Sequence, residues 1–186
     1  MIAFLGNRPV LKIGRHHVAL YGSDWLSDAL RRAAHAAEHD DFPFIDEIRD
    51  GIFHYLETKC PLRLLPVSDL VKRVRRMLME IGCTPIAERL EPFAPPVTIS
   101  LIEAAREADN GFELAFFESL RAEIRGLRDE GASEIRFTGI REAVLRLAGV
   151  AKWNQRCDTL LADLRDFLAR QQAGDARRAV VLTVDC

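Results

Sequence analysis

The stretch PVSDLVKRVRRMLMEIGCTPIAERL, residues 66–90, decides the fold expected for the first half of this chain. Ser68 is a candidate N-cap for a helix, and Gly82 is typical of the position just after a helix end. Thr84 and Pro85 predict the start of a second, short helix. The apolar side of the first helix recurs at helical spacing and consists of Leu70, Val74, Leu78 and Ile81.

A β-hairpin and two more helices are predicted before this stretch. Residues 10–13 should form a strand that turns at Gly14 and returns over residues 16–21, because glycine tolerates positive φ. A further short strand is expected at residues 1–5. Ser23 is a candidate N-cap for a helix that frays near Asp40-Asp41, and the next helix should run from about Ile45 to Cys60.

Three short motifs lie within this order of elements. They are VLK at residues 10–12, VSDLV at 67–71, and LMEIG at 78–82 followed by IA at 86–87. On these residues, about 10–90 of the chain resembles the ATP-cone, a small nucleotide-sensing module of many ribonucleotide reductases and of the regulator of their transcription. The resemblance implies ATP or dATP as ligand, and a homo-oligomer or a protein partner whose contacts the nucleotide changes.

The resemblance also implies a set of phosphate-binding cations at the hairpin. The family's hairpin reads VxKRxG, and Lys12 matches its lysine, whereas Ile13 stands in place of its arginine. Arg15 could supply the missing charge from a neighbouring position. Clustered cations beside backbone donors offset the charge of a polyphosphate.

Three further residues complete the expected nucleotide site. Trp25 stands where the family often has a lysine, and its indole could stack on a base or belong to the core. Lys72 or Arg76 could assist if the third helix approaches the hairpin. The alternative for Lys72, Arg73, Arg75 and Arg76 is a solvated helix face, offset by nearby acidic residues.

The second half begins after EPFAPP, residues 91–96, whose three prolines oppose a continued helix. We therefore expect an ATP-cone-like domain over residues 1–91, a linker at 92–96 and a small α/β domain over 97–186. Alternation over residues 97–101 predicts a strand, and Asp109-Asn110-Gly111 predicts a turn. Helices at 112–129, 139–147 and 153–174 and strands at 134–137 and 180–184 complete a β-α-β-α-β order. The expected fold class is α+β or α/β, with a three-stranded, partly parallel sheet in this half.

One pattern in the first half points to metal chemistry instead. His35, Glu38 and His39 match the HxxEH pattern of inverzincin metalloproteases, in which two histidines of one helix face reach a zinc ion. Histidines near a helix C-terminus also interact favourably with the helix dipole and need no metal.

Composition narrows the classes of function. The 186-residue chain carries a formal net charge of −2, so no general attraction to nucleic acid or to an anionic membrane is expected. Its apolar start is too short for a membrane span. The spacing of the four cysteines, Cys60, Cys83, Cys157 and Cys186, contains no CxxC pair and suits a reduced, cytoplasmic setting.

Three functions remain in order of preference. The first is a non-enzymatic regulatory or adaptor protein that binds ATP or dATP, and the second is an interaction scaffold that binds no nucleotide. The third is an enzyme whose site lies on loops after Leu101, Phe137 or Val184, because ligands of open α/β sheets gather at the carboxyl ends of strands. The acidic residues Glu103, Glu107 and Asp109 would stand near such a site.

Overall fold

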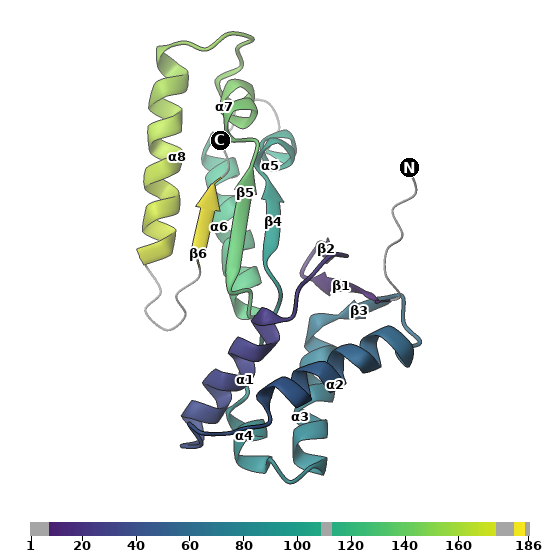
Figure 1. The fold of residues 1–186 in the computed structure, drawn as a ribbon. Helices are drawn as coiled ribbons and strands as arrows, with labels where there is room; N and C mark the ends of the chain where they lie inside the picture. Colours follow the sequence, from purple (N-terminus) through teal and green to yellow (C-terminus); the bar gives the residue numbers. More distant parts are fainter. Residues whose placement is uncertain (1–7, 109–112, 174–180, 185–186) are drawn as a thin grey trace. The chain divides into compact units, whose positions relative to one another are not determined.

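The computed structural model describes residues 8–108, 113–173 and 181–184, and the strand predicted at residues 1–5 lies outside them. The fold is mixed α and β, as predicted (Figure 1). The chain divides into two compact units. The N-terminal unit runs to Pro95 and includes residues 129–131, and the remaining residues form the C-terminal unit.

The N-terminal unit contains a mixed three-stranded sheet in the order β2-β1-β3. The predicted hairpin is present as β1 (Val10–Ile13) and β2 (His16–Val18), which pair antiparallel. The return strand ends at Val18, three residues earlier than expected. β3 (Leu64–Pro66) pairs with β1 in parallel and was not predicted, because three residues that end in proline carry no alternating pattern.

The described residues of the N-terminal unit also form four helices, two before β3 in the chain and two after it. They are α1 (Asp24–Ala36), α2 (Ile45–Thr58), α3 (Val67–Glu80) and α4 (Thr84–Arg89). Ser23 takes the N-cap position of α1, although its side chain makes no capping hydrogen bond. The expectation that Ser68 caps α3 is wrong: Pro66 ends β3 in an extended conformation, so the helix already begins at Val67.

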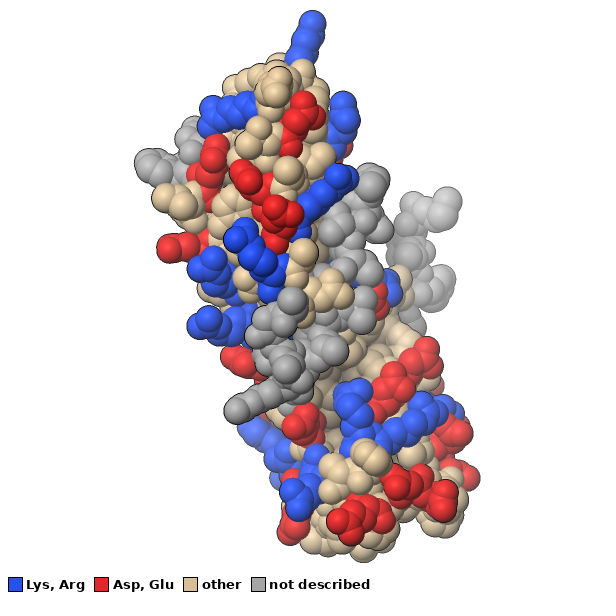
Figure 2. Space-filling model, turned by 90° about the vertical axis from the view of Figure 1, so that its left-hand side faces the viewer, with Lys and Arg blue, Asp and Glu red and all other residues tan. Residues whose placement is uncertain are grey.

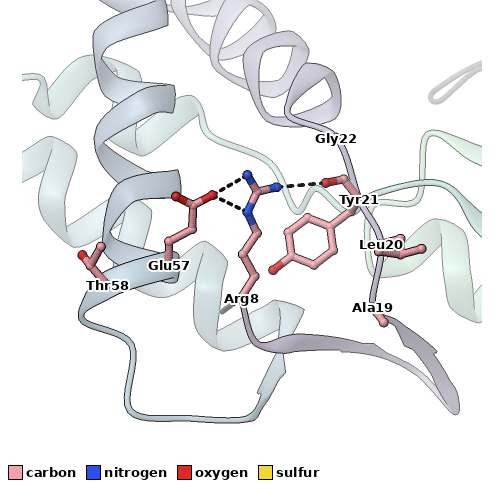
Figure 3. A pocket seen from close by; sticks show the side chains of 7 residues that line it. All are labelled: Arg8, Ala19, Leu20, Tyr21, Gly22, Glu57 and Thr58. Carbon is pink, nitrogen blue, oxygen red and sulfur yellow. Dashed lines mark hydrogen bonds and ion pairs between the residues drawn. The ribbon is translucent and has the colours of Figure 1, made fainter. Parts of the chain in front are cut away.

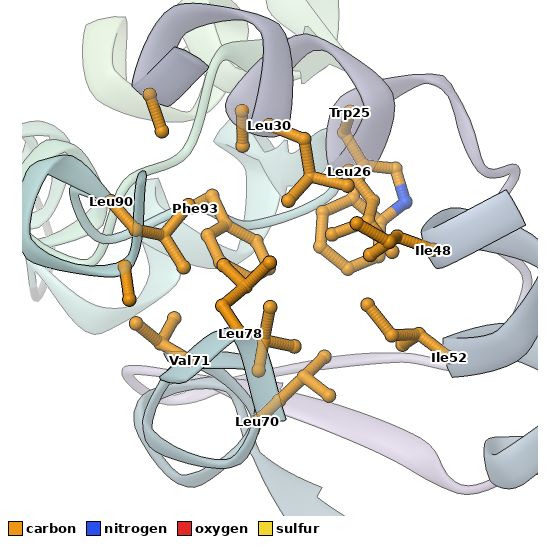
Figure 4. Close-up of a cluster of buried hydrophobic side chains, with 14 of the residues drawn as sticks. Trp25, Leu26, Leu30, Ile48, Ile52, Leu70, Val71, Leu78, Leu90 and Phe93 are labelled. Carbon is orange, nitrogen blue, oxygen red and sulfur yellow. The ribbon is translucent and has the colours of Figure 1, made fainter. Parts of the chain in front are cut away.

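The helices and the sheet enclose one apolar core in this unit. Leu11 and Leu65 reach it from the sheet and are completely buried. Figure 4 shows side chains of the helices converging on this core, and Trp25 and Phe93 lie within it with their rings 5.6 Å apart. Ile81, expected on the apolar side of α3, is instead 54% exposed, because α3 ends one residue before it.

The C-terminal unit contains a second sheet, in the order β4-β5-β6. β4 (Val97–Ser100), β5 (Glu134–Thr138) and β6 (Val181–Val184) are all parallel to their neighbours. The helices of this unit are α5 (Leu101–Glu107), α6 (Glu113–Asp129), α7 (Ile140–Ala148) and α8 (Gln155–Ala173). None of the helices in the described ranges is long and apolar enough to cross a membrane.

Alternation of buried and exposed side chains fixes the faces of β4 and β5. Val97, Ile99, Ile135 and Phe137 are buried, and the pairing register places Val97 opposite Ile135 and Ile99 opposite Phe137. Thr98 lies opposite Arg136 on the other face, where both are exposed. One face of these strands is therefore apolar and covered, and the other is polar.

Three sequence-based assignments in this unit are wrong. Leu101 is not the last residue of a strand but the first of α5, because the Ser100 hydroxyl accepts a hydrogen bond from the Glu103 amide and caps that helix. The spacing of Leu114 predicts that it lies on the apolar side of the helix expected at 112–129, but Leu114 is 82% exposed at the start of α6, and the buried position nearby is Phe116. Trp153 precedes α8 rather than belonging to it.

α7 is bounded by two glycines with left-handed backbones. Gly139 at its start has φ +73°, and Gly149 at its end has φ +68°. A Cβ atom at Gly139 would lie 2.7 Å from two side-chain carbons of Ile102, whereas a Cβ at Gly149 would meet nothing within 4 Å.

Candidate functional site

A cavity of about 750 Å³ lies beside the hairpin of the N-terminal unit (Figure 3). Its walls are the segment between β2 and α1, the last turn of α2, and Arg8, which precedes β1. We call it the hairpin cavity, and it is lined by Arg8, Ala19, Leu20, Tyr21, Gly22, Glu57 and Thr58.

Arg8 and Glu57 form the charged part of the hairpin cavity. The Arg8 Nε donates a hydrogen bond of 2.6 Å to a carboxylate oxygen of Glu57, and the Arg8 Nη1 donates one of 3.3 Å to the Tyr21 carbonyl. The guanidinium carbon lies 4.8 Å from the centre of the Phe53 ring, a cation–π distance. The cavity therefore presents one positive and one negative group in direct contact.

Tyr21 contributes a neutral hydroxyl that is tied to the backbone. Its hydroxyl donates a hydrogen bond of 2.8 Å to the Pro9 carbonyl. Burial raises the pKa of Tyr21 to about 12, with a smaller opposing effect from Arg8, because an apolar environment disfavours the phenolate. The hydroxyl thus remains a donor at neutral pH and fixes the segment before β1.

The structure does not bring the predicted hairpin cations into this cavity. Lys12 lies opposite His17 in the antiparallel register, on the face of the sheet away from the buried Leu11 and Ile13. Arg15 is exposed in the turn, and neither Lys12 nor Arg15 lines the hairpin cavity.

Trp25 belongs to the core rather than to a ligand surface. It is only 5% exposed, and its indole nitrogen donates a hydrogen bond of 2.6 Å to the Gly22 carbonyl. Its ring contacts those of Tyr21, Phe53 and Phe93. Of the two roles open to it from the sequence, core packing describes its position.

The basic residues of α3 separate into groups with different partners. Lys72 forms an ion pair of 3.3 Å with Asp69, and Arg75 donates a hydrogen bond of 2.6 Å to the Leu90 carbonyl. Arg73 and Arg76 instead line a second hollow, of about 600 Å³, between α2 and α3. We call this hollow the α2–α3 groove, and its lining is Gly51, Ile52, Tyr55, Leu70, Arg73, Val74, Arg76, Met77 and Glu80.

The HxxEH segment does not present its ligands on one helix face. α1 ends at Ala36, and Glu38 has φ 60°, so Glu38 and His39 lie beyond the helix. His35 pairs with Asp40 at 2.5 Å, and His39 Nδ1 lies 2.6 Å from the Ala37 carbonyl. Within the described ranges, no group of three or more histidine, cysteine or acidic residues is arranged to hold a metal ion.

The charges on one face of the molecule are mixed in sign. On the face shown in Figure 2, lysine and arginine side chains alternate with acidic ones, and neither sign forms a continuous area. Glu103 and Glu107 both lie on α5, and Asp109 lies outside the described residues. Of the four cysteines, Cys60, Cys83 and Cys157 are free thiols, and Cys186 lies outside the described residues.

Arg8, Glu57 and the groove-facing position of Arg73 were not anticipated from the sequence. Arg8 and Glu57 stand 49 positions apart and belong to no motif, so only the folded chain brings them together.

Comparisons of the chain with protein-family models, with curated proteins and with solved structures find no match.

Proposed function

We propose that this protein is a non-enzymatic regulatory or adaptor protein whose N-terminal unit is ATP-cone-like and binds ATP or dATP. The observation that carries the proposal is the hairpin cavity, which lies beside the hairpin where the resemblance places a nucleotide. Its volume of about 750 Å³ falls in the range of small-molecule sites. Nucleotide binding there would bias the contacts of the protein with a second copy or with a partner.

The residues of the cavity suggest how a nucleotide would be held. Arg8 would contact a phosphate, since a guanidinium has five N–H donors and can bind a phosphate oxygen while it holds Glu57. Glu57 would accept a hydrogen bond from a ribose hydroxyl or a base amine. Lys12 and Arg15 would attract the polyphosphate through the field of the hairpin rather than by direct contact.

Thermal unfolding with and without nucleotide tests the proposal. Because a ligand that binds only the folded state stabilises it, ATP at a hundred times its Kd should contribute about 2.7 kcal/mol and raise the Tm. Arg8→Ala should abolish this shift. Arg31→Ala is the matched control, since Arg31 is an exposed arginine of α1 paired only with Asp28 among the described contacts.

Two results would contradict the proposal in different ways. If neither ATP nor dATP shifts the Tm, the protein binds neither nucleotide. If the Tm shift persists in Arg8→Ala but is lost in Lys12→Ala, the phosphate binds at the outer face of the hairpin instead of in the cavity. Light scattering at the same nucleotide concentrations would then show whether binding changes the oligomeric state.

A second candidate function is an interaction scaffold without a nucleotide. The observation that favours it is the Arg8–Glu57 pair, because a carboxylate in contact with Arg8, the one cation among the described residues that line the cavity, opposes the entry of a polyanion. Under this function the Arg8–Glu57 pair serves to join β1 to α2. Neither the Tm nor the oligomeric state would then respond to nucleotides.

A further inference from the structure

We propose that the α2–α3 groove is a docking site for an acidic amphipathic helix of a partner protein. The groove shares no lining residue with the hairpin cavity, so this proposal does not depend on nucleotide binding. It rests on the apolar floor of the groove, on the charges along one wall, and on a glycine in the other wall.

The floor of the groove is part of the apolar core. Ile52, Leu70 and Val74 line it and are at most 4% exposed, and all three belong to the core cluster. Met77 lines it as well and packs on that cluster while remaining partly exposed. An apolar side chain that enters the groove would therefore extend the core rather than rest on a polar surface, which is how helices anchor in grooves.

The α3 wall carries charges at a spacing that matches a helix. Arg73 and Arg76 are one turn apart, and Glu80 follows one turn later, so the three span about 10 Å along the axis. Arg73 donates a hydrogen bond of 2.5 Å to the Tyr55 hydroxyl, which holds its side chain at the rim. Within the described residues, neither Arg73 nor Arg76 forms an ion pair with a carboxylate.

These charges define the chemistry of the occupant. Two carboxylates one turn apart would face Arg73 and Arg76, and a neutral or basic residue would face Glu80. Apolar side chains at positions i, i+3 or i+4, and i+7 would point into the floor. A small organic anion would satisfy the arginines but would leave the far end of the groove, beside Glu80, unmatched.

The α2 wall is open at Gly51. A Cβ atom at this position would meet nothing within 4 Å, so packing inside the chain does not require glycine there. Glycine inside a helix costs about 1 kcal/mol relative to alanine. Because glycine has no side chain, α2 does not project into the groove at this position, and an approaching helix has room there.

A selection of displayed helical peptides against the full chain tests the proposal. The library varies the charge and the apolar spacing of 14-residue helices, and enriched peptides are then measured by fluorescence anisotropy. We expect enriched sequences to be acidic, with apolar residues at the stated spacing. The double variant Arg73→Glu, Arg76→Glu should weaken their binding about tenfold or more, and Arg31→Glu should leave it unchanged.

Gly51→Leu separates a binding role from a structural one. Leucine favours the helix, and its Cβ would meet nothing within 4 Å, so the Tm should stay equal or rise while peptide affinity falls at least as far as in the double variant. The proposal is overturned if no helical peptide is enriched or if enriched peptides bind the double variant and Gly51→Leu as well as the parent. Decanoate serves as a probe for a small anionic ligand. The proposal is also overturned, and a small anionic ligand favoured, if decanoate displaces the peptides at a lower concentration than an acidic helix does.

Discussion

Replacing Gly139 with alanine tests whether the start of α7 is fixed by backbone conformation and by close packing together. The left-handed backbone at φ +73° costs an alanine about 1–2 kcal/mol. The new methyl group would also lie 2.7 Å from two carbons of Ile102, and overpacking of this kind costs about 1–3 kcal/mol more. We therefore expect Gly139→Ala to lower the free energy of unfolding by about 2–5 kcal/mol.

Gly149→Ala is the matched control at the other end of the same helix. Its backbone is equally left-handed at φ +68°, but its Cβ would meet nothing within 4 Å, so only about 1–2 kcal/mol should be lost. The free energies come from urea unfolding followed by Trp153 fluorescence in a shared Trp25→Phe background, so that the signal reports the C-terminal unit. A smaller residue at position 102 isolates the packing contribution.

In the double variant Gly139→Ala, Ile102→Ala the contact is gone, so the two changes should cost less together than the sum of their separate costs. The same change at Ile102 should be additive with Gly149→Ala. The packing argument is refuted if the two glycine substitutions lower the free energy of unfolding equally, or if the effect of Ile102→Ala is additive with both of them. Only the backbone effect would then remain.

Three further predictions concern single residues. Phe116→Ala should destabilise the C-terminal unit by about 3–5 kcal/mol, whereas Leu114→Ala should stay within about 0.5 kcal/mol in urea unfolding, because only the first side chain is buried. Spectrophotometric titration at 295 nm should show a phenol ionising near pH 12 that is lost in Tyr21→Phe. Since the pKa of Tyr21 is raised by folding, its contribution to stability is fully present below about pH 10 and declines as the pH rises from there toward 12. Acrylamide should quench the fluorescence of Trp153→Phe, which retains the buried Trp25, less than that of Trp25→Phe; equal quenching would contradict the burial of the first indole.

The elements that could be predicted are those with a long apolar pattern or a clear turn. The periodicity of α2 and α3 and the glycine between β1 and β2 place these elements within a few residues of their observed bounds. β5 could be predicted equally well, because its apolar residues, which are buried in the structure, alternate with polar ones. In each case the signal is local, so one stretch of sequence contains all of it.

The elements that could not be predicted depend on distant partners or on a single side chain. β3 exists because three residues pair with β1, which lies more than fifty positions earlier. α5 begins where it does because one serine hydroxyl caps it, and alternation through Leu101 continued the strand pattern past that point. Leu114 has the spacing of a buried residue, but burial is decided by which face of α6 packs, and that face is set by Phe116 and Leu120.

The candidate sites were less predictable than the fold for the same physical reason. A resemblance in the hairpin directs attention to Lys12, whereas the register of β1 turns this side chain away from the core. The cation of the hairpin cavity is Arg8, which acquires its position through Glu57 and Tyr21. The α2–α3 groove likewise arises from two helices whose individual patterns say nothing about the space between them.

The all-parallel pairing of the second sheet has a consequence for the order in which the chain folds. The hairpin of the first unit joins positions 11 and 18, a loop that closes in microseconds, whereas β4 meets β5 only across positions 97 and 135, and β5 meets β6 across 135 and 182. The entropy of closing these longer loops must be overcome before any of the ladder hydrogen bonds form. The parallel pairing of β1 with β3 in the first unit joins positions 10 and 64 and carries a similar cost. Kinetic experiments should therefore resolve an early phase that belongs to the hairpin of β1 and β2 and a later phase in which the parallel strands of both sheets pair.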